Sequence, residues 1–257
     1  MKADPVSQMP EPITNIDRIR SLLVLAALLG TIIFNWLAAT GYLGGITPAA
    51  ISREHPTVVT PADYVFSIWT LIYLGLAVFS IFQLTRKGSV ASIPIRSLFI
   101  FTCALNCAWL FFWLQDQIVI CAGLIWALGT ALILIEKKLR TLNAPLFIKA
   151  VFGTYLGWVI VAALINSVIA FSFGNGTRSF GAYEGAIMVL IAAGVGVALR
   201  VLLTDYFAPL AIAWGLTAIA VQQSGKTVIV SAAAVGVVAC LIASFTFVLN
   251  LNSSRNE

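Results

Sequence analysis

The sequence predicts an all-α fold: a polytopic membrane helix bundle with about eight transmembrane helices. Of its 257 residues, 60% are hydrophobic and only 10% are charged. Soluble domains carry roughly 25% charged residues, so this chain has too little polar surface to fold as a water-soluble domain. Its apolar residues also fall into runs of about 20, the length that crosses the hydrocarbon core of a bilayer. The lipid bilayer is therefore the first expected partner.

Eight apolar runs follow one another along the chain. Pro61, Pro94 and Pro145 stand at the starts of the second, third and fifth runs, where the missing N–H costs a helix nothing. Arg200 and Asp205 crowd the junction of the sixth and seventh runs, so a kinked pair or a re-entrant segment is the alternative there. The runs cover residues 19–39, 62–84, 95–114, 118–136, 146–171, 183–203, 206–222 and 228–249.

The basic residues predict the orientation. With eight spans and a cytoplasmic N-terminus, 12 of the 15 Lys and Arg residues lie on the cytoplasmic side, where short basic loops are retained. We therefore expect both termini in the cytoplasm and a multi-pass protein of the cell's inner or plasma membrane. The outer side receives Arg53, Arg178 and Lys226, and the cytoplasmic side Lys2, Arg18, Arg20, Arg86, Lys87, Arg96, Lys137, Lys138, Arg140, Lys149, Arg200 and Arg255.

The composition argues against several function classes. The net charge of +5 comes from clusters between apolar runs, so no nucleic-acid partner is expected. The four cysteines lie inside apolar runs without a CxxC pair, and His55 is the only histidine, so no metal site is expected. No run carries a central ionisable residue, which argues against catalytic residues, an enzyme and a proton-coupled pump.

Aromatic and amide side chains form stripes on three runs. Each set repeats at helical spacing and therefore shares one helix face. Counted at about 1.5 Å per residue, the central tryptophans come within roughly 8 Å of mid-membrane, whereas an interfacial aromatic belt lies near 15 Å. The stripes contain Phe66, Trp69 and Tyr73 in the second run, Asn106, Trp109 and Trp113 in the third, and Tyr155, Trp158, Ala162 and Asn166 in the fifth.

Two interpretations of these stripes remain open, helix packing and a ligand pocket. Buried indole N–H groups need an acceptor, which the side-chain carbonyl of Asn106 or Asn166 can supply. The second run is directed inward and the third and fifth outward, so most of the stripes meet in the outer half of the membrane, below the 40–61 loop. Flat aromatic walls with a few amides suit a large, planar, mostly apolar ligand.

The same residues resemble the tryptophan-rich sensory protein family, also called the translocator protein or TspO/MBR family. Residues 60–75 read T-P-A-D-Y-V-F-S-I-W-T-L-I-Y-L-G, where the second helix of that family typically reads P-P-x-W-V-F-G-P-V-W-T-L-L-Y. Residues 104–112, A-L-N-C-A-W-L-F-F, are similar to its L-N-x-x-W-x-x-x-F-F. Residues 154–166, T-Y-L-G-W-V-I-V-A-A-L-I-N, are similar to its P-Y-x-x-W-x-x-x-A-x-x-L-N.

The chain departs from these motifs at named positions. Tyr64 stands in place of the first tryptophan, Ser67 and Ile68 replace the Gly-Pro pair, and Thr154 replaces the proline before Tyr155. The fifth helix also ends without the tyrosine and basic residue of the family's sterol-associated pattern, which argues against cholesterol binding.

The resemblance implies a long variant of a five-helix family. Its parts would be a cytoplasmic tail (1–18), a TspO-like five-helix bundle (19–171), three additional helices (172–250) and a C-terminal tail (251–257). The additional helices would cover one side of the bundle or mediate a homo-oligomer. We expect the ligand pocket inside the five-helix bundle.

The resemblance also implies a receptor, regulator or carrier of porphyrins or related tetrapyrroles, with no other cofactor. The implied ligand-binding residues are Trp69, Tyr73, Asn106, Trp109, Trp158, Asn166, Phe66, Tyr155 and Ala162. Two alternatives remain. A secondary transporter of small solutes is supported by the eight spans and the glycine-rich sixth run. A membrane scaffold or assembly protein would use the stripes for packing alone.

Overall fold

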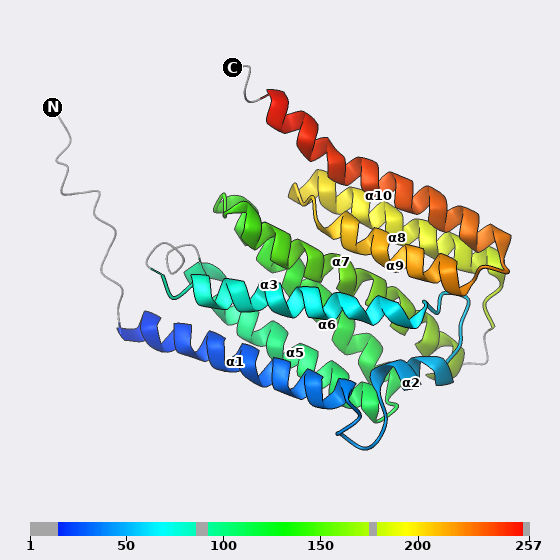
Figure 1. Cartoon of the computed structure of the whole chain (residues 1–257), viewed down its shortest axis with the longest axis horizontal. Coiled ribbons are helices and arrows are strands. Elements are labelled where there is room, and N and C mark those ends of the chain that lie inside the picture. Colours follow the sequence, from blue (N-terminus) through cyan, green and yellow to red (C-terminus); the bar gives the residue numbers. More distant parts are fainter. Residues whose placement is uncertain (1–14, 86–91, 175–178, 254–257) are drawn as a thin grey trace.

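The computed structural model of the chain describes residues 15–85, 92–174 and 179–253. Within these ranges every regular element is a helix, and the long helices lie side by side in one elongated bundle (Figure 1), which confirms the predicted all-α membrane fold. Seven helical segments are long and apolar enough to cross a membrane, and an eighth apolar helix is shorter.

The helices follow the predicted order. The long ones are α1 (Asn15–Ala39), α3 (Ile68–Phe82), α5 (Arg96–Leu114), α6 (Ile118–Thr141), α7 (Leu146–Ile169), α8 (Ala182–Leu203), α9 (Ala208–Gln222) and α10 (Thr227–Ser253). A short helix α2 (Pro48–Glu54) lies in the loop after α1. Single turns flank three long helices: η2 (Asp63–Ser67), η3 (Ile93–Ile95) and the π-helical η4 (Ala170–Gly174).

Several boundaries differ from the sequence-based ones. Helix α1 begins at Asn15 rather than residue 19, and residues 1–14 of the predicted N-terminal tail lie outside the described part of the chain. Helix α10 runs to Ser253, beyond the predicted end at residue 250. Helix α9 has 15 residues, or about 22 Å, which is short of a bilayer core of about 30 Å. It is shielded by α7, α8 and α10, which all pack against it.

Residues in left-handed conformation end three of the helices. Asp116 (φ 56°), Asn143 (φ 47°) and Thr204 (φ 58°) follow α5, α6 and α8. Asp and Asn tolerate this conformation better than other residues with a side chain, because their short polar groups hydrogen-bond locally. At the start of α2, Thr47 caps the helix, since its Oγ1 accepts a hydrogen bond from the Ala50 N–H at 3.3 Å.

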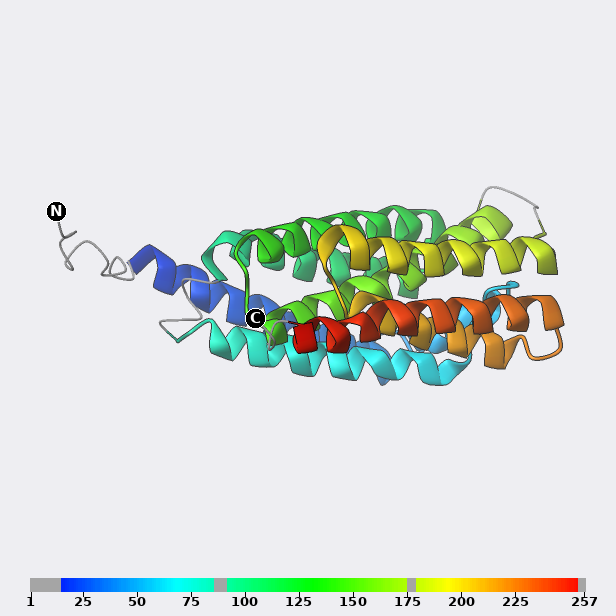
Figure 2. The same ribbon diagram turned by 90° about the horizontal axis from the view of Figure 1, so that it is seen from above.

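Two groups of helices make up the bundle. The first contains α1, α3, α5, α6 and α7, and the second contains α8, α9 and α10 (Figures 1 and 2). They meet mainly where α7 packs against α9. This seam is close because Gly157 faces the backbone at the start of α9: a Cβ on Gly157 would lie 2.8 Å from the Ala208 Cα. Small residues of this kind permit close helix packing in membranes.

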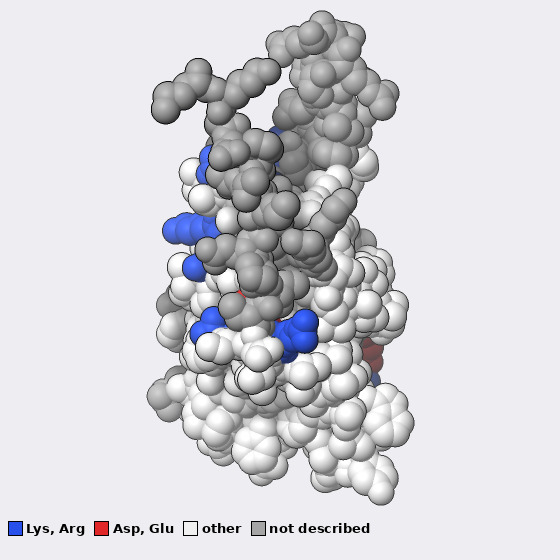
Figure 3. Space-filling model, turned by 90° about the vertical axis from the view of Figure 1, so that its left-hand side faces the viewer, with Lys and Arg blue, Asp and Glu red and all other residues white. Residues whose placement is uncertain are grey.

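Helix α1 begins and α10 ends toward the same end of the bundle, on the left in Figure 1. Figure 3 looks onto this end and shows Lys and Arg side chains on it. We call it the basic end; its exposed cations include Arg18, Arg20, Lys137, Lys138 and Arg140. This arrangement agrees with the even number of crossings expected from the sequence.

We predict that the basic end faces the cytoplasm, because short basic loops are retained there. Reporter fusions at Asn143 and after Glu257 should then be active in the cytoplasm, and a fusion at Gly44, in the loop after α1, only outside. A C-terminal reporter that is active only on the outer side would contradict this topology and point first to α9 as a segment that does not cross.

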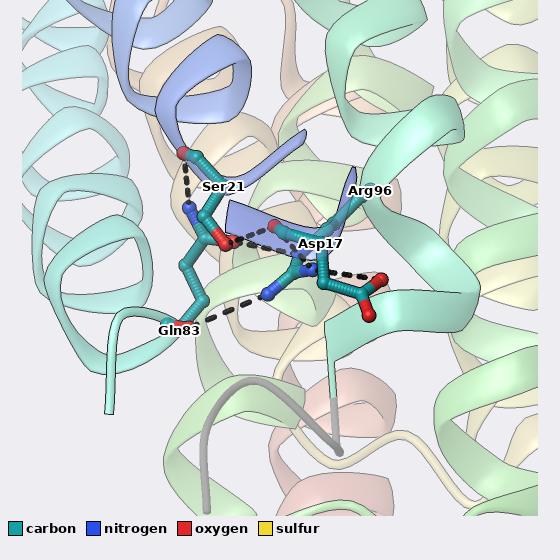
Figure 4. A network of polar contacts seen from close by, with 4 residues as sticks. All are labelled: Asp17, Ser21, Gln83 and Arg96. Carbon is teal, nitrogen blue, oxygen red and sulfur yellow. Dashed lines mark hydrogen bonds and ion pairs between the residues drawn. The ribbon is translucent and has the colours of Figure 1, made fainter. Parts of the chain in front are cut away.

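A buried arginine ties three helices together at the basic end (Figure 4). The Arg96 side chain is 1% exposed, and its Nε donates to Gln83 Oε1 at 2.9 Å. Its Nη1 donates to the Asp17 carbonyl at 3.2 Å, and Gln83 Nε2 donates to the Ser21 carbonyl at 2.9 Å. These bonds hold the start of α1 against the end of α3 and the start of α5.

Candidate ligand-binding site

An apolar cavity of about 560 Å³ lies between α1, α3 and α5, with the start of α2 at one end. We call it the α1–α3 cavity. Its volume is within the range of about 300–1,000 Å³ that small-molecule sites occupy. It is lined by Ile32, Asn35, Trp36, Ala39, Thr47, Pro48, Ala49, Phe66, Trp69, Thr70, Tyr73, Leu74, Ala77, Trp109 and Leu110.

Trp69 is the centre of the aromatic wall of this cavity. Its ring stacks on Tyr73, with centroids 5.5 Å apart and planes 16° apart, and it lies 6.3 Å from the ring of Trp109. On its other side it meets Tyr155 and Trp158 edge-on, at 5.8 and 6.2 Å. Such stacked and edge-on pairs are favourable geometries for aromatic rings. The three predicted stripes therefore do meet around one side chain.

Three polar groups meet behind this wall. Asn106 is fully buried, and its Oδ1 accepts hydrogen bonds from Asn35 Nδ2 at 2.9 Å and from the Tyr73 hydroxyl at 3.4 Å. Asn106 thus orients two residues that line the α1–α3 cavity without lining it itself. Asn35 was not among the residues predicted from the sequence, although its amide lies inside the first apolar run and was a usable signal.

The indole N–H of Trp109 donates to one of the two asparagine acceptors expected from the sequence. Its Nε1 donates to Asn166 Oδ1 at 3.1 Å, while Asn166 Nδ2 donates to the Ala162 carbonyl at 2.8 Å. A second, much smaller cavity of about 20 Å³ lies beside this pair. It is lined by Ser52, Pro61, Phe66, Trp109, Trp113, Trp158, Ala162, Ile165 and Asn166.

The nine predicted site residues thus fall into four groups. Phe66 and Trp109 line both cavities. Trp69 and Tyr73 line only the α1–α3 cavity, and Trp158, Ala162 and Asn166 line only the smaller one. Asn106 and Tyr155 line neither of these two cavities and are 0% and 2% exposed.

The α1–α3 cavity opens on the flank of the bundle. Two of its lining residues, Trp36 on α1 and Leu74 on α3, are 63% and 62% exposed. Both belong to segments apolar enough to span the membrane, so their exposed faces meet lipid. These two side chains form the rim between the cavity and the surrounding membrane.

The lining of the α1–α3 cavity is mostly apolar and carries no ionised side chain. Among the residues that line the α1–α3 cavity there is no carboxylate, histidine, lysine or arginine. The polar groups that reach it are amide and hydroxyl groups from Asn35, Thr47, Thr70 and Tyr73. In the described part of the chain, no group of three or more His, Cys, Asp or Glu residues is placed to hold a metal ion.

The fold and the cavity define a class: a polytopic α-helical membrane protein whose tryptophan-rich motifs surround an aromatic cavity in the bundle. The chain belongs to the TSPO-like protein family, whose model matches residues 21–247. The match extends beyond the five helices that carried the resemblance and includes α8, α9 and most of α10. No curated protein and no solved structure matches the chain significantly.

Proposed function

We propose that this protein binds a large, planar, mostly apolar ligand of the tetrapyrrole class in the α1–α3 cavity, as a membrane receptor or carrier. The observation that carries the proposal is the cavity itself, because Phe66, Trp69, Tyr73 and Trp109 from the family-like motifs line it together. Its volume of about 560 Å³, its flat aromatic wall and its few hydrogen-bonding groups suit such a ligand.

Trp69 is the residue whose loss tests the site most directly. Trp69→Leu should weaken ligand binding about two- to tenfold, since a stacked aromatic contact contributes about 0.5–1.5 kcal/mol. Purified protein should be titrated with a porphyrin, a bilin, a sterol and a carotenoid, and binding followed by the absorption change of the ligand. Thermal unfolding of each variant without ligand should accompany the titrations.

Trp126→Leu is the matched control. Trp126 lies on α6, is 51% exposed and donates its Nε1 proton to Ser167 Oγ, away from the α1–α3 cavity. This Trp126 variant should bind ligand as the wild type does. If no compound in the panel saturates, or if the Trp69 and Trp126 variants bind equally well, the aromatic wall serves only helix packing and the proposal fails.

Measuring ligand entry into proteoliposomes distinguishes a carrier from a receptor. If the ligand that saturates the cavity also enters proteoliposomes faster in the presence of the protein, the carrier role holds. If it binds without faster entry, the protein is a receptor.

A further inference from the structure

The segment between α2 and η2, residues 55–62, connects two parts of the lining of the α1–α3 cavity. Before it in the chain, residues 47–49 at the start of α2 line one end of the cavity. After it, Phe66 of η2 lines the cavity wall. Figure 1 shows this segment leaving α2 and approaching the end of α9, at the right of the bundle, before α3 begins. The contacts that hold the 55–62 segment therefore bear on how the cavity is closed.

Gln223, the first residue after α9, holds this segment through its side chain. The residue is 8% exposed, and its Nε2 donates to the carbonyls of Thr57 at 3.1 Å and Thr60 at 3.2 Å. Its Oε1 accepts a hydrogen bond from Lys226 Nζ at 2.8 Å, directly before α10. The amide therefore directs both of its donor hydrogens at the 55–62 segment and is itself oriented by Lys226.

Helix α9 also binds the end of this segment and the start of η2. The Ala62 N–H donates to the Ala218 carbonyl at 3.0 Å. The indole Nε1 of Trp214, one turn earlier on α9, donates to the Val65 carbonyl at 3.2 Å. The Trp214 ring also meets the Tyr64 ring edge-on, with centroids 5.2 Å apart. Backbone and side-chain groups of one helix thus fix the path of the chain into η2.

Helix α8 leaves space for the middle of the segment. A Cβ on Gly185 of α8 would lie 2.9 Å from Val58 Cγ2 and 3.3 Å from Ile229 Cδ1 of α10. Val58 is 9% exposed, and the neighbouring Val59 is fully buried. Glycine lets a neighbouring chain approach a membrane helix closely, so Val58 packs against α8 beside α10. The segment is therefore bound by α9 and by α8 together.

Helix α2 also has contacts with the end of α5, which offer another way to hold it. Trp113 Nε1 of α5 donates to the Pro48 carbonyl at 3.1 Å. His55 Nε2 lies 3.4 Å from Asp116 Oδ1, in the turn after α5. If these contacts alone place α2, changes at Gln223 leave α2 undisturbed. The effect on α2 itself therefore separates the two explanations.

We propose that α8 and α9 form a docking site that holds the 55–62 segment, with Gln223 as a positioning residue. Through this segment the docking site keeps α2 and Phe66 in place at the α1–α3 cavity, and it slows the escape of a bound ligand. Its role in ligand retention rests on the proposed function, whereas its role in placing α2 does not. None of the residues that line the α1–α3 cavity in the described part of the chain belongs to α8–α10. The docking site consists of Gly185, Trp214, Ala218 and Gln223.

Hydrogen–deuterium exchange of the full-length protein in lipid nanodiscs, without ligand, tests the positioning. Gln223→Glu keeps the shape of the side chain and its bond to Lys226, but it places an oxygen where two carbonyls need a donor. The amides of residues 57–62 and of α2 should then exchange about tenfold faster or more, since two hydrogen bonds are lost. Exchange in α6 should not change, which excludes global unfolding. Gln222→Glu, one residue earlier and exposed, is the matched control and should exchange as the wild type does.

Gly185→Ala perturbs the docking site from α8 and leaves Gln223 intact. Its Cβ would displace Val58, so the same amides should exchange faster, whereas Gly194→Ala on the same helix should not change them. If residues 57–62 exchange at the wild-type rate in both the Gln223 and the Gly185 variants, the docking site does not hold the segment. If these residues exchange faster but α2 does not, α5 alone places α2. Either result would overturn the proposal.

Ligand retention is measured with protoporphyrin IX as the probe, by its transfer from the protein to empty liposomes. If a ligand leaves when α2 opens, its dissociation rate rises in the same proportion as the exchange of the α2 amides. Dissociation from Gln223→Glu should therefore be faster than from Gln222→Glu and the wild type. If the wild type does not bind the probe, the proposed function fails while the exchange result for α2 stands. Equal dissociation rates from both variants would instead overturn the role of the docking site in retention.

Discussion

Gly157→Ala is expected to destabilise the protein more than any other single-methyl substitution on α7. The added Cβ would lie 2.8 Å from backbone atoms of Ala208, which cannot rotate away as a side chain can. Overpacking of this kind lowers the free energy of unfolding by about 1–3 kcal/mol or more. The clash should push α9 away from α7. The change should lower the unfolding temperature in detergent and the yield of folded protein.

Gly194→Ala on α8 is the control for this prediction, because a Cβ there would meet no atom within 4 Å apart from its chain neighbours and the nearby backbone of its own helix. Alanine is favoured over glycine in helices by about 1 kcal/mol, so this variant should be as stable as the wild type or slightly more stable. Equal stability of the two alanine variants would mean that α7 and α9 do not pack as closely as described.

Arg96→Met should have an effect of similar size and should also abolish ligand binding. The substitution keeps much of the volume but removes the donor of Gln83 Oε1 and one of the donors to the Asp17 carbonyl, which also accepts a hydrogen bond from the Ser21 hydroxyl at 2.8 Å. A buried acceptor left without a donor, as Gln83 Oε1 would be, costs about 1–3 kcal/mol. Because these bonds hold α1 against α3 and α5, their loss should release one wall of the α1–α3 cavity.

Arg20→Met, on the exposed face of α1, separates this network effect from a general effect of lost charge. It should unfold and bind ligand as the wild type does. If Arg96→Met retains both stability and saturable binding, the buried network does not position α1, and the cavity is held by apolar packing alone.

The sequence predicted the helices well because their ends carry local signals. Pro145 stands directly before α7, as expected, and Asn143 and Thr204 stop α6 and α8 by adopting left-handed backbone conformations. The start of α1 was misplaced because Asn15, Asp17 and Arg18 are polar. In the structure this first turn is helical, and the Asp17 carbonyl accepts a hydrogen bond from Arg96 of α5. Hydropathy alone does not register such contacts.

The candidate site was only partly accessible from the sequence. Helical spacing placed Trp69 with Tyr73, and their rings stack in the structure. It also placed Asn106 with Trp109, but only Trp109 lines the α1–α3 cavity. Spacing does not reveal which part of a stripe a neighbouring helix covers, and α1 covers Asn106 through Asn35. The contribution of α1 was therefore missed.

The burial of Glu136 and Asp205 was missed for a related reason. Glu136 stood at the predicted end of its apolar run and Asp205 in a loop, where both would normally meet water. Their burial depends on how α8 and α9 fold over α6 and α7, and that is a property of the tertiary structure.

The exposed rim formed by Trp36 and Leu74 affects how affinity has to be expressed. An apolar compound that dissolves in the bilayer reaches this opening from the lipid, at a concentration set by its partition coefficient rather than by the amount added to the buffer. The apparent dissociation constant should then rise in proportion to the amount of lipid in the sample. The mole fraction of ligand in the membrane is therefore the quantity to compare between compounds.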